Sequence, residues 1–340
     1  MIRSQADGDA EPSHQQAAAA SVEVALATYN SEPFLSALLD SLFAQTNQGF
    51  TLIVSDDRST DATLEILDRY ASLHPGRIRL LPEHDEPLGP LGNFARLLDH
   101  ATGDYLLLCD HDDVWLPNKI ALSVESIQAL EAEHRTNTPL LVHTDLIVAG
   151  PDLAVISPSL IRYAHIDPAR NDLISLLTAN VATGCATIVN RSLYERARPV
   201  PREAMMHDHW LALVAAALGA IAYVDQPTIL YRQHGGNAIG AQKPGTATLI
   251  HRIRQTVFSD VRRRVMLRYS RNAAALLSRF GAEMRPHHRR ATETLANLWS
   301  SSRWRRFALL RRSGLGMRGF VRNAALLVVV TRRGPIEPES

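Results

Sequence analysis

The stretch Leu106-Leu107-Leu108-Cys109-Asp110-His111-Asp112-Asp113 decides how this chain folds, because an apolar run ends abruptly in three carboxylates. The run predicts a buried strand over Asp104–Cys109. Carboxylates beside such a strand are costly unless a cation or hydrogen bonds compensate them. Mg²⁺ and Mn²⁺ prefer oxygen ligands of this kind, which makes Asp110 and Asp112 candidate metal ligands. The alternative is ordinary helix capping and loop solvation.

Strand and helix patterns alternate before this stretch. Strands are predicted at Val22–Ala27, Thr51–Ser55 and Arg77–Leu81, each followed by apolar residues at helical spacing. The alternation predicts a parallel sheet with helices on both faces, which binds ligands at the carboxyl ends of its strands. Three polar clusters stand at such ends, and we expect them to converge at one edge: Thr28–Asn30, Asp56–Asp57 and Asp110–Asp113.

Beyond Pro117 the order of elements becomes irregular. Further strands are predicted at Leu140–Val148, Thr183–Asn190 and Ile221–Val224, with helices at Asp172–Leu177 and from Asp208 to about Leu218. This order favours an α+β half joined to the parallel half.

The net charge of +1 conceals two opposite parts. Residues 1–250 carry 16 Lys or Arg and 30 Asp or Glu, whereas residues 251–340 carry 20 Arg and five acidic residues. Arginine mixed with Trp299, Trp304 and Phe307 is typical of a helix on anionic lipid. Packing of this region on the preceding domain is one alternative. Nucleic-acid binding is another, but no recognised module accompanies the charge, and we expect no nucleic-acid partner.

The ends and the cysteines add a few expectations. Residues 1–20 are polar and lack the apolar core of a signal peptide, so we expect a disordered lead-in. The sequence contains no run of 18 apolar residues, so we expect no helix that spans a membrane. Cys109 and Cys185 are expected to be buried, reduced thiols, which fits the cytosol.

Three ordered motifs resemble those of the family-2 glycosyltransferases, over roughly residues 20–240. They are Ala27–Asn30, Val54–Asp61 and Asp110–Trp115. Two segments, Asp110–Lys119 and Tyr231–Gly240, are most similar to a bacterial branch that includes rhamnosyltransferases of surface-polysaccharide assembly. The resemblance implies a GT-A domain at residues 21–244, with a mixed sheet covered by helices on both faces. An Arg-rich helical region at residues 245–340 would follow, and would associate with the inner face of the cell membrane.

The resemblance also implies an activity. It is inverting, metal-dependent transfer of a sugar from a nucleotide-diphosphate donor to a glycan or lipid-linked glycan. The metal would be Mg²⁺ or Mn²⁺, and dTDP-rhamnose is the donor we expect. A UDP-hexose donor and a catalytically inactive nucleotide-sugar-binding protein are the alternatives. A nucleotidyltransferase normally needs a Gly-rich, Lys-containing phosphate loop, which the sequence lacks. A glycoside hydrolase also needs two carboxylates, but it would not need motifs that bind a nucleobase and a metal.

Site residues follow position by position from the resemblance. Donor binding is expected from Thr28, Tyr29, Asn30, Asp56, Asp57, Asn93, Arg96, Asp110 and Arg232. Metal binding is expected from Asp110, Asp112 and His234, the last of which has an ordinary loop histidine as its alternative. Acceptor contacts are expected from Asn180, Thr183, Gly184 and Trp210.

The general base is expected at Asp208, at the start of a helix in the second half of the domain. A helix N-cap is the alternative for this residue. Many family members have Glu before this Asp, and the present chain has His207 there instead. His111 also departs from the family pattern, and no role is assigned to it.

Overall fold

The computed structural model describes residues 20–235, 261–315 and 328–331. Its elements, in chain order, are β1 (Val22–Thr28), α1 (Glu32–Phe43), β2 (Phe50–Asp56), α2 (Thr63–Leu73), β3 (Ile78–Leu80), α3 (Gly89–His100), β4 (Tyr105–Asp110), β5 (Val114–Trp115), α4 (Lys119–Ala132), β6 (Leu140–Ala149), β7 (Val155–Ser157), α5 (Leu160–Tyr163), α6 (Leu173–Leu176), η1 (Gly184–Ala186), β8 (Thr187–Asn190), α7 (Arg191–Ala197), α8 (His207–Leu218), β9 (Ala220–Arg232), α10 (Val261–Phe280), α11 (Pro286–Ala296), η2 (Leu298–Ser300) and α12 (Arg303–Arg312).

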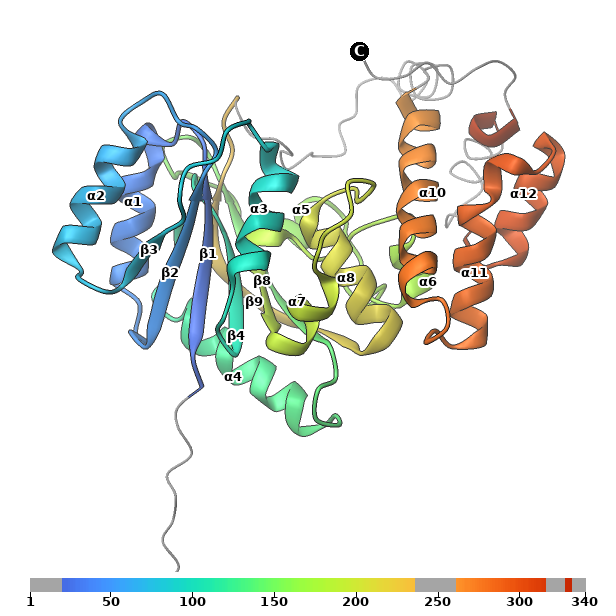
Figure 1. Ribbon diagram of the computed structural model, residues 1–340, viewed down its shortest axis with the longest axis horizontal. Coiled ribbons are helices and arrows are strands. Elements are labelled where there is room, and N and C mark those ends of the chain that lie inside the picture. Colours follow the sequence, from blue (N-terminus) through green and yellow to red (C-terminus); the bar gives the residue numbers. More distant parts are fainter. Residues whose placement is uncertain (1–19, 236–260, 316–327, 332–340) are drawn as a thin grey trace, which may run out of the picture.

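The strands of the described ranges form one mixed sheet in the order β3-β2-β1-β4-β8-β6-β9-β5, with β7 paired to β6. β1 pairs in parallel with both β2 and β4, and β2 pairs in parallel with β3. β8 then enters antiparallel between β4 and β6. The predicted α/β class with a mixed sheet is therefore confirmed (Figure 1).

Alternate residues of β1 point into two separate cores, as the period of a strand requires. Val24 and Leu26 belong to the core under α1, α2 and α4. Ala25 and Ala27 face the other core, which α3, α7 and α8 cover. Because both faces of β1 are buried, the strand reads as a nearly continuous apolar run.

β9 is much longer than the sequence predicted. The prediction was Ile221–Val224, but the strand runs over Ala220–Arg232 and pairs in parallel with β6. The pairing shifts register between Val224 and Pro227, because proline cannot donate to the ladder and is accommodated at an irregularity. The extension carries Arg232 to the edge of the sheet where β4 ends.

The described part of the Arg-rich region packs on the part of the chain that contains the sheet (Figure 1). The ring of Phe280 in α10 lies 6.3 Å from that of Trp210 in α8. Arg279 donates to the carbonyl of Pro199 at 2.8 Å, and apolar residues of α10 to α12 join the core beneath α8. None of the helices within the described ranges is long and apolar enough to cross a membrane. The lead-in at residues 1–19 and the boundary at 244/245 lie outside the described residues.

Glu23 is the single charge in the apolar strand β1, and the fold gives it four donors. Its carboxylate accepts the backbone N–H groups of Thr102 and Gly103 at 2.7 and 2.9 Å. It also accepts the Thr102 hydroxyl and the guanidinium of Arg79, each at 3.0 Å. Burial alone would raise the pKa of Glu23, but the hydrogen bonds outweigh burial and hold the pKa below its usual value.

Replacing Glu23 by Gln should lower the free energy of unfolding by about 1–3 kcal/mol at pH 7, since buried donors lose a charged acceptor. A depressed pKa contributes stability above the unfolded-state pKa, and that stability is lost as pH falls through the folded-state value. Urea unfolding at pH 7 and pH 4 should therefore show a smaller difference between variant and wild type at pH 4. The exposed Glu133→Gln is the control, and equal stabilities of Glu23→Gln and wild type at pH 7 would contradict this account.

Candidate active site

A cavity of about 800 Å³ opens at the carboxyl ends of the parallel strands β1, β2 and β4. Thr28 pairs with Asp56, and Ala27 pairs with Asp110, so the three strand ends lie side by side. The convergence predicted from the sequence is therefore observed. The cavity is lined by Ala27, Thr28, Tyr29, Asn30, Phe34, Asp57, Arg58, Pro87, Gly89, Pro90, Asn93, Phe94, Asp110, His111, Asp112, Met206, His207, Tyr231 and His234.

The turn after β1 presents an aromatic ring to this cavity. Tyr29 is 55% exposed and lines the cavity wall, as a residue that stacks on a base would. Asn30 adopts a left-handed conformation, with φ at 45°, and its side chain accepts the N–H of Thr60 at 2.8 Å. Asp56 accepts the hydroxyl of Thr28 at 2.7 Å and the N–H of Ser59 at 2.8 Å. Asp56 thus fixes the turn, and it does not line the cavity.

Asp57 lies at the cavity wall and also anchors the loop before α3. Its two oxygens accept the N–H groups of Leu88 and Gly89 at 2.7 and 2.8 Å. Each carboxylate oxygen has a second lone pair, so these bonds leave acceptor capacity for a ligand. The residues around Asp57 in the sequence could not predict these two backbone partners, because Leu88 and Gly89 lie 31 and 32 residues further along the chain.

Asn93 and Arg96 of α3 have different positions. Asn93 lines the cavity and donates to the carbonyl of Ser55 at 2.9 Å, while its buried Oδ1 has no hydrogen-bond partner in the part of the chain that the structure describes. Arg96 donates to the hydroxyl of Ser55 at 2.9 Å and to the carbonyl of Pro82. The structure therefore places Asn93 at the cavity and Arg96 behind it.

The loop after β4 meets the end of β9 at the cavity. The Nε2 of His234 lies 2.9 Å from Oδ2 of Asp112, across 122 residues of sequence. Arg232 fixes this meeting, because its Nε donates to the Asp112 carbonyl at 2.8 Å and its backbone N–H donates to Asp113 at 3.1 Å. The three residues predicted to hold a metal, Asp110, Asp112 and His234, all line the cavity.

The charge at this loop is concentrated and poorly solvated. Burial, followed by the charges of Asp112 and Asp208, raises the pKa of Asp110 to about 7. Burial, followed by the charges of Asp112 and Asp110, also raises the pKa of Asp113. A divalent cation would relieve the repulsion, and the carboxylates of Asp110 and Asp112 supply the oxygen ligands that Mg²⁺ and Mn²⁺ prefer. The donor set therefore fits the expected metal.

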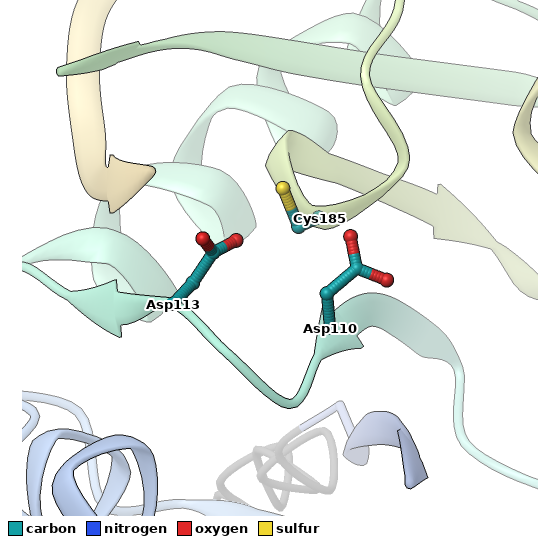
Figure 2. A group of neighbouring side chains, drawn as sticks. All are labelled: Asp110, Asp113 and Cys185. Atoms are coloured by element: carbon teal, nitrogen blue, oxygen red, sulfur yellow. The ribbon is translucent and has the colours of Figure 1, made fainter. Parts of the chain in front are cut away.

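A deeper cluster lies behind the loop and was missed from the sequence. Ligand atoms of Asp110, Asp113 and Cys185, one from each residue, lie within 4.8 Å of one another (Figure 2). The ammonium of Lys119 is fully buried nearby, 4.5 Å from the centre of the Trp115 ring. Burial lowers the pKa of Lys119 to about 8, while the neighbouring thiols and Asp113 oppose that shift.

Lys119 supplies positive charge on the side of the carboxylates away from the cavity. A signal for it existed in the sequence, because a lysine at the first position of a helix opposes the helix dipole. Both cysteines are free and buried, as predicted.

Asp208 lies in the first turn of α8 but is not its N-cap, which is Met206. The carboxylate accepts the N–H of Gly184 at 3.1 Å and that of His209 at 2.6 Å. Burial raises the pKa of Asp208 to about 6, and these hydrogen bonds limit the rise. Its charge also raises the pKa of Asp110, so the base candidate lies near the metal candidate.

The predicted acceptor residues divide into two groups. Asn180 closes a turn on Ala182 and its side chain also hydrogen-bonds Asp208, and the N–H of Gly184 is bonded to Asp208, so both lie near the base candidate. Thr183 accepts the Thr187 hydroxyl at its carbonyl. Trp210 is fully buried, and its indole N–H donates to the Ala197 carbonyl at 2.8 Å. The structure thus places the Trp210 side chain in the core rather than at the cavity.

Comparison with known proteins agrees with this geometry. Residues 23–136 match the model of glycosyl transferase family 2. The dTDP-rhamnosyl transferase RfbG of Shigella flexneri is 27% identical over 228 residues, covering 64% of this chain and 74% of RfbG. The UDP-Glc:alpha-D-GlcNAc-diphosphoundecaprenol beta-1,3-glucosyltransferase WfgD of Escherichia coli is 25% identical over 169 residues, covering 49% and 59%. The crystal structure of S. aureus TarS 1-349 in complex with UDP-GlcNAc has 17% identity and a TM-score of 0.51, covering 91% and 90%, and shares the fold.

Replacing Asp112 by Asn should weaken Mn²⁺ binding in the presence of dTDP by at least about tenfold, since one charged ligand is replaced by a neutral amide. Calorimetric titration of Mn²⁺ into the full chain measures this affinity. The exposed Asp68→Asn on α2 is the matched control. Equal Mn²⁺ affinities for wild type and Asp112→Asn would remove Asp112 from the metal site.

Proposed function

We propose that this chain, a family-2 glycosyltransferase, moves a sugar from a nucleoside-diphosphate donor to a glycan or lipid-linked glycan with inversion at the anomeric carbon. The family and the enzyme class predicted from the sequence are confirmed by the family match and by the named relatives. The donor, metal, acceptor and place of action are our proposals.

One observation carries the proposal most directly. The charge of Asp208 contributes to the raised pKa of Asp110, so the two carboxylates lie near each other. Asp110 lies at the end of β4 with the expected metal ligands, while Asp208 lies at the start of α8. A donor whose diphosphate lies at Asp110 would therefore place its anomeric carbon between the two carboxylates.

Asp208 has the properties of a general base for a single displacement. Its pKa of about 6 leaves it unprotonated near neutral pH, yet makes it more basic than an ordinary aspartate. In the proposed step it accepts the proton of the acceptor hydroxyl as that oxygen forms a bond to the anomeric carbon. The bond from this carbon to the diphosphate oxygen breaks on the opposite side, and the nucleoside diphosphate leaves.

The residues around Asp110 prepare the site for the leaving group. Arg232 holds the loop, and the contact between His234 and Asp112 fixes a second side chain at the cavity. When bound there, Mg²⁺ or Mn²⁺ would neutralise the negative charge that develops on the diphosphate. Tyr29 and Asp57, which also line the cavity, would contact the nucleobase.

We propose dTDP-rhamnose as the donor, and the similarity to RfbG, a dTDP-rhamnosyl transferase, supports it. The name of WfgD gives UDP-Glc as its donor and a diphosphoundecaprenol-linked sugar as its substrate. That relative keeps a UDP-hexose as the alternative donor, and it supports a lipid-linked acceptor.

Contact with an anionic membrane is proposed for α12. Trp304, Arg305, Ala308, Arg311 and Arg312 are all exposed, and their spacing places them on one face of the helix. Trp304 is 66% exposed, while Leu310 on the opposite face is buried in the core. A tryptophan among arginines on an exposed helix face suits the surface of a bilayer that contains anionic lipid.

The wild-type protein with Mn²⁺ should release nucleoside diphosphate from dTDP-rhamnose, in a panel with UDP-glucose, UDP-GlcNAc and GDP-mannose. Asp208→Asn should still bind the donor, but its transfer rate should fall by roughly 10²–10⁴-fold, because the base is lost. The wild-type rate should also fall as pH drops through about 6, where Asp208 becomes protonated. Near-normal turnover by Asp208→Asn would remove it from this role, and release from none of the donors would overturn the function.

Replacing Trp304 by Ser and the two exposed arginines Arg311 and Arg312 by Gln should reduce co-sedimentation of the full chain with vesicles. The vesicles contain phosphatidylglycerol and phosphatidylcholine, and each lost cation removes about 1 kcal/mol of attraction. Substitution is preferable to truncation, because α10 and α11 contribute to the core. Equal sedimentation of variant and wild type, with unchanged melting temperature, would contradict a role of α12 at the membrane.

A further inference from the structure

His207 combines two features that rarely occur together. Its side chain is only 4% exposed although it lines the cavity. Both ring nitrogens are buried without a hydrogen-bond partner among the described residues. Buried polar groups are almost always paired, so an unpaired imidazole at a cavity wall indicates that a partner arrives from outside the chain.

The position of His207 decides which part of a ligand it could meet. Its ring stacks on Phe94 of α3, with centroids 3.7 Å apart and an angle of 19° between planes. A Cβ on Gly184 would lie 3.0 Å from Nε2 of His207 and 3.6 Å from Oδ2 of Asp208, so both side chains flank Gly184. His207 therefore belongs to the end of the cavity near the base candidate, where the transferred sugar would lie.

We propose that His207 is a specificity-determining residue that pairs with a hydroxyl group of the transferred sugar. This inference rests on the proposed function, because it assumes a nucleotide-sugar donor in this cavity. A neutral imidazole has one donor and one acceptor nitrogen, which matches a hydroxyl that both accepts and donates. An anionic diphosphate would instead be matched by donors alone.

The charge state of His207 and its neighbour Met206 both fit this role. Burial lowers the pKa of His207 to about 3, so the ring stays neutral throughout the physiological range and keeps an acceptor nitrogen. Met206 lines the same cavity and is half-buried. Its unbranched thioether is flexible, so the cavity wall beside His207 can adjust to a sugar.

The test compares the full-length wild type with His207→Leu, which removes both nitrogens at similar volume, and His207→Gln, which keeps a donor and an acceptor. Calorimetry with Mn²⁺ present measures the affinity for dTDP and for dTDP-rhamnose, UDP-glucose, UDP-GlcNAc and GDP-mannose. His207→Leu should bind dTDP like wild type, but the nucleotide sugar preferred by wild type should bind on the order of tenfold more weakly or worse. His207→Gln should recover part of that loss.

Folding is controlled separately. Relative to wild type, the melting temperature of His207→Leu should fall no further than that of the exposed control variant His134→Phe. The reason is that the ring nitrogens of His207 make no hydrogen bond with the described residues. Equal affinity of His207→Leu and wild type for the sugar nucleotide would overturn the inference and leave the proposed function standing. Equal loss of dTDP and dTDP-rhamnose binding would also overturn it, since it would show a general structural role. Failure of the wild type to bind any of the four sugar nucleotides would instead overturn the proposed function.

Discussion

Like-charge repulsion between buried carboxylates is the constraint on which this site depends. Asp110, Asp112, Asp113 and Asp208 all meet at one sheet edge, where burial and mutual repulsion raise the pKa of Asp110 to about 7. Such a group of acids is stable only if fixed donors and cations surround it. Arg232 supplies part of that compensation through its backbone and guanidinium, and a bound cation would supply the rest.

The sheet is arranged so that this compensation comes from distant parts of the chain. β4 carries Asp110, and the long strand β9 delivers Arg232 beside it from the far side of the sheet. Lys119, at the start of α4, adds a buried positive charge behind the loop. At the opposite end of β1, Glu23 shows the same rule, since one buried anion there collects four hydrogen bonds.

Much of this arrangement could be predicted from local patterns. Parallel strands that end in polar residues place those residues at one edge, so the convergence of Thr28, Asp57 and Asp110 followed from the βα alternation alone. The strand β1 and the helix that begins beside Asp208 could also be predicted from local sequence patterns. The position of Asp208 relative to Asp110 needed both the family resemblance and the sheet order, because no local pattern fixes it.

Long-range partners could not be predicted from the sequence, for physical reasons. The contact between His234 and Asp112 depends on the register of β9, which shifts near Pro227. The inward position of Trp210 depends on α10, whose Phe280 packs against it. The unpaired nitrogens of His207 become evident only when every neighbour is in place.

The anomeric configuration of the product tests the central claim most directly. Proton magnetic resonance of the first product formed from the nucleotide sugar that the wild type turns over reports this configuration before it can equilibrate. A single displacement assisted by Asp208 predicts a product of inverted configuration relative to the donor. A product of retained configuration would require two displacements, and would contradict the assignment of one base opposite the leaving diphosphate.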